Sequence, residues 1–306
     1  MTPQIVEDVL RELIHYPLYH CTILMQLAYE PVPPTRSRAL LSSGTVLCYP
    51  NVLSYMRFLI QRDGFLTLWR GFGNFLLKHK LQHRISQVSN VLADYLLEDG
   101  QLMQEWLAGQ AEGLPAIQRL INNWRLANRL LVPEMMALAL SVTISYPLHV
   151  VMLRKMAETV EQEVTSSFNL NIFSLTWRIY QNEGITAFFS GLTPYLLYQV
   201  GSLWLAGNLA FLVHIRTRFN NQAWQNMHNA APVYGYLSQF LLHPLEVVAT
   251  VMAVSGSGMK VAEHVQGGWV EYLSRLASSH QLFRGFFYFL RRYSYPQENI
   301  SKSDNL

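Results

Sequence analysis

Two long stretches of the chain are almost free of charged side chains. Residues 184–215 contain no Lys, Arg, Asp or Glu, and residues 219–259 contain only Glu246. Each stretch exceeds the ~20 residues that cross the ~30 Å hydrocarbon core of a bilayer, whereas buried core helices of soluble proteins seldom exceed ~14 apolar residues. The pattern therefore predicts an all-α membrane protein with apolar spans at 130–153, 188–215 and 232–255.

Two further spans are predicted to be more polar, one at the N-terminus and one at 72–97. The second contains the polar residues Lys78, His79, Lys80, Gln82, His83, Arg84, Gln87 and Asn90. Its apolar residues form one helical stripe: Leu77, Leu81, Ile85, Val88, Leu92 and Tyr95. A Lys or Arg at the bilayer centre costs ~2.5–3.5 kcal/mol, so the polar face is expected to meet water. The alternatives are that the basic side chains extend to the headgroups, or that the segment lies at the interface.

Two short phrases recur three times along the chain. The first is Tyr16-Pro17-Leu18, Tyr146-Pro147-Leu148 and His243-Pro244-Leu245. The second is Leu68-Trp69-Arg70-Gly71-Phe72, Phe188-Phe189-Ser190-Gly191-Leu192 and Leu282-Phe283-Arg284-Gly285-Phe286. The glycines of the last two copies are 94 residues apart and the prolines 97 apart, so both markers give nearly the same period.

These phrases define one domain, 1–306, with repeats at about 1–97, 126–219 and 230–295. Residues 98–125 are predicted to be a polar loop between repeats, and residues 296–306 a polar tail. Each repeat is expected to contain a hydrophobic helix with the proline, a loop, a short amphipathic helix, a turn and a second hydrophobic helix. Pro17, Pro147 and Pro244 are expected to kink their helices.

Helical spacing marks the short helices of the first two repeats. The shared faces are Val52, Tyr55, Met56, Leu59 and Ile60 in the first, and Phe168, Ile172, Leu175, Thr176 and Ile179 in the second. Gly64 and Gly184 follow an acidic residue and are expected to end these helices at positive φ. The third repeat has Ser278, Ser279 and His280 near that place and lacks this signal.

Composition excludes several functions. The net charge of +3 is too small and too scattered to indicate a nucleic-acid partner. The cysteines Cys21 and Cys48 form no CxxC pair, and HKLQH at 79–83 lacks the glutamate of a zinc protease, so no metal or cofactor is expected. No phosphate-binding loop, GxSxG elbow or dinucleotide fingerprint is present, so the protein is not expected to be an enzyme. Glu7, Asp8 and Glu12 argue against a cleavable transit peptide, and targeting is expected to be internal.

The repeats resemble those of mitochondrial carriers, whose odd-numbered helices carry the motif Pro-x-[Asp/Glu]-x-x-[Lys/Arg]. The segment Ala28-Tyr29-Glu30-Pro31-Val32-Pro33-Pro34-Thr35, with Phe188–Pro194 and Ser202–Leu205, resembles the mitochondrial carrier homolog family more closely. That resemblance implies a multi-pass protein of the mitochondrial outer membrane. It also implies an insertase for α-helical outer-membrane proteins, with ties to apoptosis and to lipid handling.

The charged gate of carriers is missing here. The motif positions are Pro17/Tyr19/Thr22, Pro147/His149/Met152 and Pro244/Glu246/Ala249, so one acidic residue remains and no basic one. Arg154 matches a further basic position of the carrier motif. One carboxylate cannot form three ion pairs, so alternating access by this gate is not expected.

The sixth carrier helix is also expected to be absent. The ten residues 286–295 would rise only ~15 Å as a helix, half of the hydrocarbon thickness, and they contain Arg291 and Arg292. This aromatic run is expected to lie at the membrane interface. The predicted fold is therefore a carrier-like bundle of five spans with a laterally open groove.

Intramembrane polar residues normally face an interior. The residues expected to line the groove are Lys78, Lys80, His83, Arg84, Gln87, Gln199, Ser202 and Glu246. For Gln199 and Ser202 the alternative is simple hydrogen bonding between helices. For Glu246 the alternative is an ion pair with Arg84 or Arg154.

The leading hypothesis for function is a passive insertase in which the groove gives the polar tail of a substrate a wet path. The expected partners are tail-anchored and other α-helical outer-membrane proteins, membrane lipids and pro-apoptotic proteins. Lipid scrambling through the same groove is compatible with this hypothesis. The alternatives are an inner-membrane solute carrier with degenerate gate motifs, and a non-catalytic outer-membrane receptor or scaffold.

Overall fold

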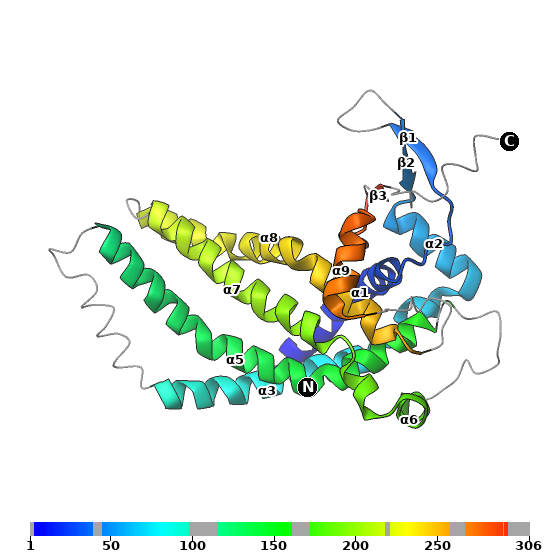
Figure 1. The fold of residues 1–306 in the computed structure, drawn as a ribbon, viewed down its shortest axis with the longest axis horizontal. Helices are drawn as coiled ribbons and strands as arrows, with labels where there is room; N and C mark the ends of the chain where they lie inside the picture. The colour runs from blue at the N-terminus through cyan, green and yellow to red at the C-terminus, as the bar shows by residue number, and fades with distance from the viewer. Residues whose placement is uncertain are drawn as a thin grey trace. The chain divides into compact units, whose positions relative to one another are not determined.

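The computed structural model describes residues 3–38, 45–97, 116–158, 160, 172–217, 221–257, 267–289 and 291–292. The chain is mostly α-helical, as predicted (Figure 1). The elements of the first repeat are α1 Pro3–Gln26, β1 Thr35–Arg38, β2 Thr45–Tyr49, α2 Val52–Asp63, the 3₁₀ helix η1 Phe65–Trp69 and α3 Phe72–Leu97. Those of the second are α5 Ala116–Ala157, α6 Ile172–Glu183, η2 Ile185–Phe189 and α7 Leu192–Thr217; those of the third are α8 Asn221–Val254, α9 Trp269–Ser278 and β3 Arg291–Arg292.

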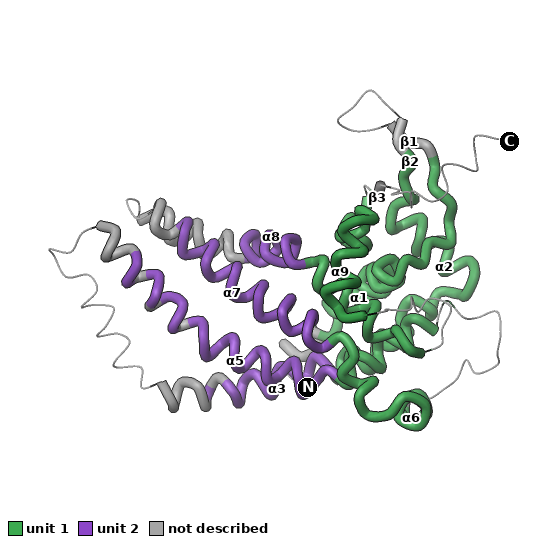
Figure 2. The backbone as a smooth tube through the Cα atoms, in the orientation of Figure 1, with its two compact units in different colours: residues 1–77, 147–191, 243–306 green, residues 78–146, 192–242 purple. Residues whose placement is uncertain are grey.

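The contacts divide the chain into two compact units (Figure 2). Unit 1 comprises residues 1–77, 147–191 and 243–306, and it contains the short helices and the small sheet. Unit 2 comprises residues 78–146 and 192–242, and it contains the larger parts of the long helices α3 and α5, all of α7, and the N-terminal part of α8.

Among the described residues, three helices are long and apolar enough to cross a membrane: Ala127–Ala157, Ile185–Val213 and Pro232–Val254. They coincide with the three apolar spans that the sequence predicts, and those predictions are confirmed at this level. The more polar segments also form long helices, α1 and α3, and α3 has the predicted bounds of 72–97. Each repeated proline lies inside a helix, in α1, α5 and α8, while kinking at these prolines stays a prediction.

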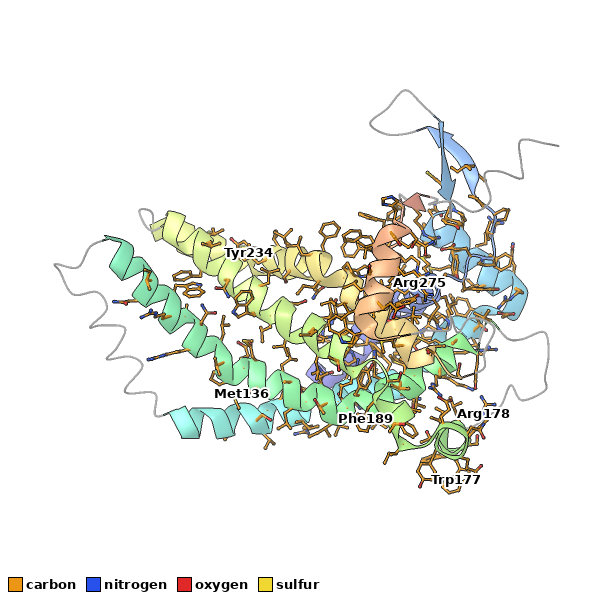
Figure 3. All side chains as sticks on the ribbon, in the orientation of Figure 1. Met136, Trp177, Arg178, Phe189, Tyr234 and Arg275 are labelled. Atoms are coloured by element: carbon orange, nitrogen blue, oxygen red, sulfur yellow. The ribbon has the colours of Figure 1, made fainter. Side chains whose placement is uncertain are left out.

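The short helices present the faces that their spacing predicts. In α2, Val52, Tyr55 and Leu59 are buried against Leu24 and Leu68, and Met56 and Ile60 pack on the same cluster. In α6, Leu175 and Ile179 pack against Val151 and Phe188, whereas Phe168 lies outside the described residues. The opposite face of α6 exposes Trp177 and Arg178 (Figure 3).

The turn glycines have the predicted geometry. Gly64 and Gly184 follow α2 and α6 with φ of 87° and 79°, and the backbone N–H of Gly64 closes α2 on the carbonyl of Ile60. In the third repeat His280 takes a positive φ of 56° after α9. A histidine there adopts a conformation that favours glycine, which is why a search for glycine does not find this turn.

The glycines of the second repeated phrase share one conformation in all three repeats. Gly71, Gly191 and Gly285 have φ of 81°, 82° and 77°. In the first repeat the Tyr16 hydroxyl donates to the carbonyl of Arg70 at 2.5 Å. In the third, His243 Nε2 lies 2.9 Å from the carbonyl of Arg284. The residue before the proline thus contacts the residue before the glycine in both repeats, which explains why the two phrases recur together.

The glycine turns of unit 1 also link each repeat to the next in a ring. A Cβ atom added at Gly71 would lie 3.6 Å from the carbonyl oxygen of Met152, on the proline helix of the second repeat. Ser190 Oγ donates to the carbonyl of Met252, in the third repeat, at 2.7 Å. A Cβ atom added at Gly285 would lie 2.9 Å from the carbonyl oxygen of Thr22, back in the first repeat. Unit 1 therefore closes on itself.

The positions of the carrier motif lie within this ring and are largely uncharged. His149, Met152 and Ala249 are buried, and Tyr19 and Thr22 are half-buried. Gln26 and Thr250 join the first and third repeats, with a hydrogen bond of 2.8 Å between their side chains. At the level where carriers have ion pairs, an uncharged hydrogen bond therefore joins the first and third repeats.

Arg154 is a buried cation that the sequence flagged only by its resemblance to carriers. It is 1% exposed, forms two hydrogen bonds with Glu183, of which the Nη2–Oε2 bond is 2.7 Å, and donates from Nε to the carbonyl of Ala253 at 3.0 Å. Glu183 is the acidic residue before the glycine turn, so this ion pair ties the proline helix of the second repeat to its short helix.

Helix α5 begins at Ala116, so residues 116–125 are helical and not part of a loop as predicted. The prediction relied on the polar composition of 98–125. However, Ile117, Leu120, Ile121 and Trp124 have the i, i+3, i+4, i+7 spacing of an amphipathic helix. Residues 98–115 lie outside the described residues.

The segment after α9 forms turns and a short strand in its described part, 279–289 and 291–292. Strand β3 pairs antiparallel with β2, with Tyr49 opposite Arg291, in a sheet of order β1-β2-β3. Arg291 is 8% exposed, forms an ion pair with Glu30, and donates to the carbonyl of Pro50 at 3.1 Å. No strands were predicted for this region, and residues 293–306 lie outside the described residues.

Candidate functional site

The polar second span contains a buried lysine. Lys78 in α3 is 5% exposed, and its Nζ donates to the hydroxyl of Tyr195 in α7 at 3.0 Å. The Nζ also lies 5.3 Å from the centre of the Tyr195 ring. Both residues belong to unit 2. A buried cation is tolerated when hydrogen bonds and an aromatic ring replace its water shell.

The Tyr195 hydroxyl has a second donor. Gln199, one turn later in α7, donates from Nε2 to this oxygen at 3.0 Å. The rings of Tyr146 and Tyr198 lie with their centres 5.5 and 6.4 Å from the Tyr195 ring. Lys78, Tyr195 and Gln199 therefore form one polar cluster between α3 and α7 with aromatic neighbours.

Lys78 and Gln199 were predicted to be site residues, whereas Tyr195 was not. A signal was present, because Tyr195 and Gln199 are four residues apart and so lie on one face of a helix. A tyrosine in an apolar span reads as a packing residue, and only the structure places its hydroxyl between the lysine and the glutamine.

The other predicted residues of α3 lie on a different face. Lys80, His83, Arg84 and Gln87 are all exposed. At 3.6 residues per turn, Lys80 and Arg84 are rotated by about 200° and 240° from Lys78 around the helix axis. The expectation that Lys78 lines the same surface as Lys80 and Arg84 is therefore wrong. It treated the positive residues as one face, although their spacing separates them.

The exposed residues of α3 form a polar face, defined here as Lys80, His83, Arg84 and Gln87. His83 Nε2 and Gln87 Nε2 lie 3.0 Å apart, one helical turn from each other. The face adjoins exposed apolar side chains, among them Leu77, Val88 and Val91. Helix α3 thus exposes its polar face and an adjoining apolar strip, and it buries Lys78 on another face.

Ser202 and Glu246 occupy different surroundings. Ser202 lies one turn after Gln199 in α7, and its Oγ is buried without a hydrogen-bond partner among the described residues. Glu246 is in unit 1, and its Oε2 lies 3.1 Å from His243 Nδ1 on the same helix. Arg154, one of the two partners considered for Glu246 as an alternative, pairs with Glu183 instead. The predicted site residues therefore divide into the cluster around Tyr195, the polar face of α3, and Glu246.

Comparison with known proteins finds carrier-like relatives. The mitochondrial carrier protein family matches residues 131–211, which include most of α5 and α7 and all of α6. The chain is 27% identical to mitochondrial carrier homolog 2 of Homo sapiens, an alignment that covers 92% of this chain and 90% of the relative. It is 26% identical to mitochondrial carrier homolog 1 of Mus musculus, covering 92% of this chain and 74% of the relative.

The resemblance deduced from the motifs is confirmed by these similarities, which extend over nearly the whole chain. Together with the three apolar helices long enough to cross a membrane, they identify a mitochondrial protein that spans the membrane more than once. The chain thus resembles the mitochondrial carrier homolog family over nearly its whole length.

Proposed function

We propose that this protein is a passive insertase for α-helical proteins of the mitochondrial outer membrane. The observation that carries the proposal is the polar face of α3. Lys80 and Arg84 lie about 12 and 18 Å along a helix of about 39 Å, which reaches across the ~30 Å hydrocarbon core. Each cation would cost ~2.5–3.5 kcal/mol in lipid at the bilayer centre. Water must therefore reach this face if α3 spans the membrane.

A wet face inside the membrane lowers the barrier that a tail-anchored substrate meets. Such a substrate has one apolar helix and a short polar tail, and its helix gains free energy in lipid. The barrier is the passage of the tail and its unpaired backbone groups through hydrocarbon. Exposed Lys, Arg, His and Gln side chains offer hydrogen bonds and water to that tail. The reaction runs downhill, so no nucleotide or catalytic group is required.

The proposal includes five membrane spans, α1, α3, α5, α7 and α8, without a sixth. The described residues after α9 form turns and a strand, which supports this count. The missing span would leave one side of the bundle open, so that the apolar helix of a substrate reaches lipid while its tail follows the polar face. Lys78 and Gln199, both bonded to the Tyr195 hydroxyl, would hold α3 and α7 together beside that path.

An odd number of spans places the chain ends on opposite sides of the membrane. The test is thiol labelling of Thr2→Cys and Ser303→Cys variants in intact mitochondria, in a background in which Cys48 is replaced by Ser. Labelling of only one of the two positions by an impermeant reagent is expected. Labelling of both from the same side would contradict the five-span topology.

Insertion itself is tested with purified protein in liposomes, using a tail-anchored substrate and a panel of small charged solutes in parallel. Protease protection of the substrate tail is expected, without solute uptake. Replacing Lys80, His83, Arg84 and Gln87 together by Leu should abolish protection, because the face becomes lipid-like. Arg57→Leu is the matched control, since Arg57 is an exposed cation on α2. Uptake of solutes without insertion would instead support a solute carrier. If the protein shows neither insertion nor uptake, the result would support a receptor.

A further inference from the structure

Helices α5 and α7 carry the same pair of residues at the same spacing. Trp124 and Asn128 are four residues apart in α5, and Trp204 and Asn208 are four residues apart in α7. All four lie in unit 2. A spacing of four places the indole and the amide of each pair on one face of their helix.

The two pairs are hydrogen-bonded to each other reciprocally. Trp124 Nε1 donates to Asn208 Oδ1 at 2.7 Å, and Trp204 Nε1 donates to Asn128 Oδ1 at 2.8 Å. Each asparagine also donates from Nδ2 to the Oδ1 of the other at 3.3 Å. The remaining Nδ2 bonds go to the backbone carbonyls of Trp124 and Trp204, at 2.9 and 2.8 Å.

This arrangement saturates both amides. A side-chain amide has two N–H donors and one oxygen with two lone pairs. Asn128 and Asn208 each use all four, with two bonds donated and two accepted. In an apolar medium an unpaired amide group is costly, so the set specifies both the partner and the register of the two helices.

The side chain of Leu131 in α5 also packs on the backbone of α7 beside these residues. A Cβ atom added at Gly207 would lie 2.6 Å from Leu131 Cδ1, which is closer than carbon atoms can approach. Glycine at that position lets α7 pack directly on Leu131 of α5. A small residue and a saturated polar set therefore join α5 and α7 at the same place.

We infer that Trp124, Asn128, Trp204 and Asn208 form a clamp that makes α5 and α7 one rigid wall of the insertion groove. The inference rests on the proposed insertase function. The four residues are positioning residues: they hold the wall in place while the substrate moves past it. The apolar helix of the substrate therefore leaves the groove elsewhere than between α5 and α7.

The rigidity of the wall is tested without any substrate. Spin labels are placed at Met136→Cys on α5 and Leu212→Cys on α7, both well exposed, after replacement of Cys21 by Ala and Cys48 by Ser (Figure 3 labels Met136). One narrow distance distribution is expected. Asn128→Asp should broaden it, because a carboxylate cannot donate either bond and would face Asn208 Oδ1. Asn122→Asp, the same change in the same helix outside the clamp, should leave it narrow.

Insertion is then measured on a clamp that is rebuilt covalently. Trp124→Cys with Asn208→Cys breaks the clamp and should slow insertion roughly threefold, the size of one interhelical polar contact. Joining the two cysteines with a short bismaleimide should restore the rate. If the double variant fails to fold, Trp204→Phe removes a single N–H donor, keeps a ring, and should broaden the distance distribution and slow insertion.

The outcomes separate the clamp from the insertase. A bismaleimide link that abolishes insertion would show that the substrate passes between α5 and α7. Broadened distances in Asn128→Asp with an unchanged insertion rate would show that the clamp does not serve insertion, and narrow distances in that variant would show that the clamp does not set rigidity. If the unaltered protein has a narrow distribution but inserts nothing, the insertase proposal fails while the rigid wall stands.

Discussion

Glu30 is an acidic side chain held beside the end of the described chain. Its Oε2 is buried without a hydrogen-bond partner among the described residues, while Oε1 pairs with Arg291. Burial raises the pKa of Glu30 above its usual value of 4.5, and the nearby guanidinium groups of Arg291 and Arg284 oppose the shift only in part. The folded protein therefore holds the Glu30 proton more tightly than the unfolded chain does.

This pKa predicts a direction for stability against pH. A raised pKa in the folded state contributes stability that is complete below the usual value near 4.5 and is lost as the pH rises through the folded value. Glu30→Gln has no titrating carboxyl at this position, so it should lose less stability than the unaltered protein as the pH rises. The measurement is thermal unfolding in detergent across pH 4 to 8. Glu271→Gln, at an exposed carboxyl of α9, is the control, and equal pH profiles for Glu30→Gln and the unaltered protein would contradict the prediction.

Arg154 predicts a large and specific loss of stability. Arg154→Leu leaves the Glu183 carboxylate without its partner in a site where Arg154 is 1% exposed. Breaking a buried ion pair from one side costs about 3–5 kcal/mol, whereas replacing both partners with apolar residues is often close to neutral. The double variant Arg154→Leu/Glu183→Leu should therefore unfold at a higher temperature than Arg154→Leu. A double variant as unstable as the single one would show that the bond to the Ala253 carbonyl carries the stability.

At the scale of elements, helix α9 ends in a Schellman motif. The N–H of Gln281 bonds to the carbonyl of Leu276 at 2.9 Å, and the N–H of His280 bonds to that of Ala277 at 3.2 Å. His280 occupies the left-handed position at φ 56°, where a Cβ atom costs energy.

His280→Gly should therefore stabilise the protein by about 1 kcal/mol, the cost of a left-handed residue with a Cβ atom. His280→Ala keeps the Cβ atom and removes the imidazole, so it separates backbone strain from side-chain contacts. The unfolding temperature in detergent should rise for Gly and not for Ala. A fall for both would mean that imidazole contacts outweigh the strain.

The elements show which parts of the structure a sequence can predict. Three apolar spans, α3, both short amphipathic helices and the glycine turns were predictable, because period and glycine act locally. The start of α5 was hidden because composition masked a helical spacing at 117–124. The strands were hidden because β1, Thr35–Arg38, and β2, Thr45–Tyr49, are only four and five residues long, and β2 also pairs with β3, more than 240 residues later.

The site was less predictable than the fold. Polarity in an apolar span drew attention to Lys78 and Gln199, and the structure joins them through Tyr195. Which side of α3 faces the protein depends on its neighbours, and no local signal gives that. The Trp–Asn pairs of α5 and α7 have equal spacing in the sequence. Only the structure shows that the two pairs form hydrogen bonds with each other.

At the scale of the whole molecule, the polar face of α3 predicts a preference for the charge of substrate tails. Lys80 and Arg84 are exposed cations, so a wet path along them should favour acidic or neutral tails and oppose basic ones. Lys80→Gln/Arg84→Gln keeps the face polar and removes its field. The ratio of acidic to basic tails inserted should then fall towards one.

The measurement compares matched tail-anchored substrates that differ only in tail charge, normalised to the abundance of the protein. Lys78→Gln is the informative companion, because Lys78 is buried against Tyr195 and does not share this face. It should change stability and leave the ratio in place. An unchanged ratio in the Lys80→Gln/Arg84→Gln variant would mean that these cations only anchor α3 at the headgroups.

The ring in unit 1 has an electrical consequence. A membrane potential does work of about 2.3 kcal/mol per elementary charge per 100 mV, so a gate made of ion pairs can feel it. Two of the contacts that close the ring join only hydroxyl, amide and backbone groups: Ser190 with Met252, and Gln26 with Thr250. None of these groups carries a net charge. A membrane potential therefore exerts no net force on the groups in these contacts. The contacts are expected to be equally stable with and without a membrane potential.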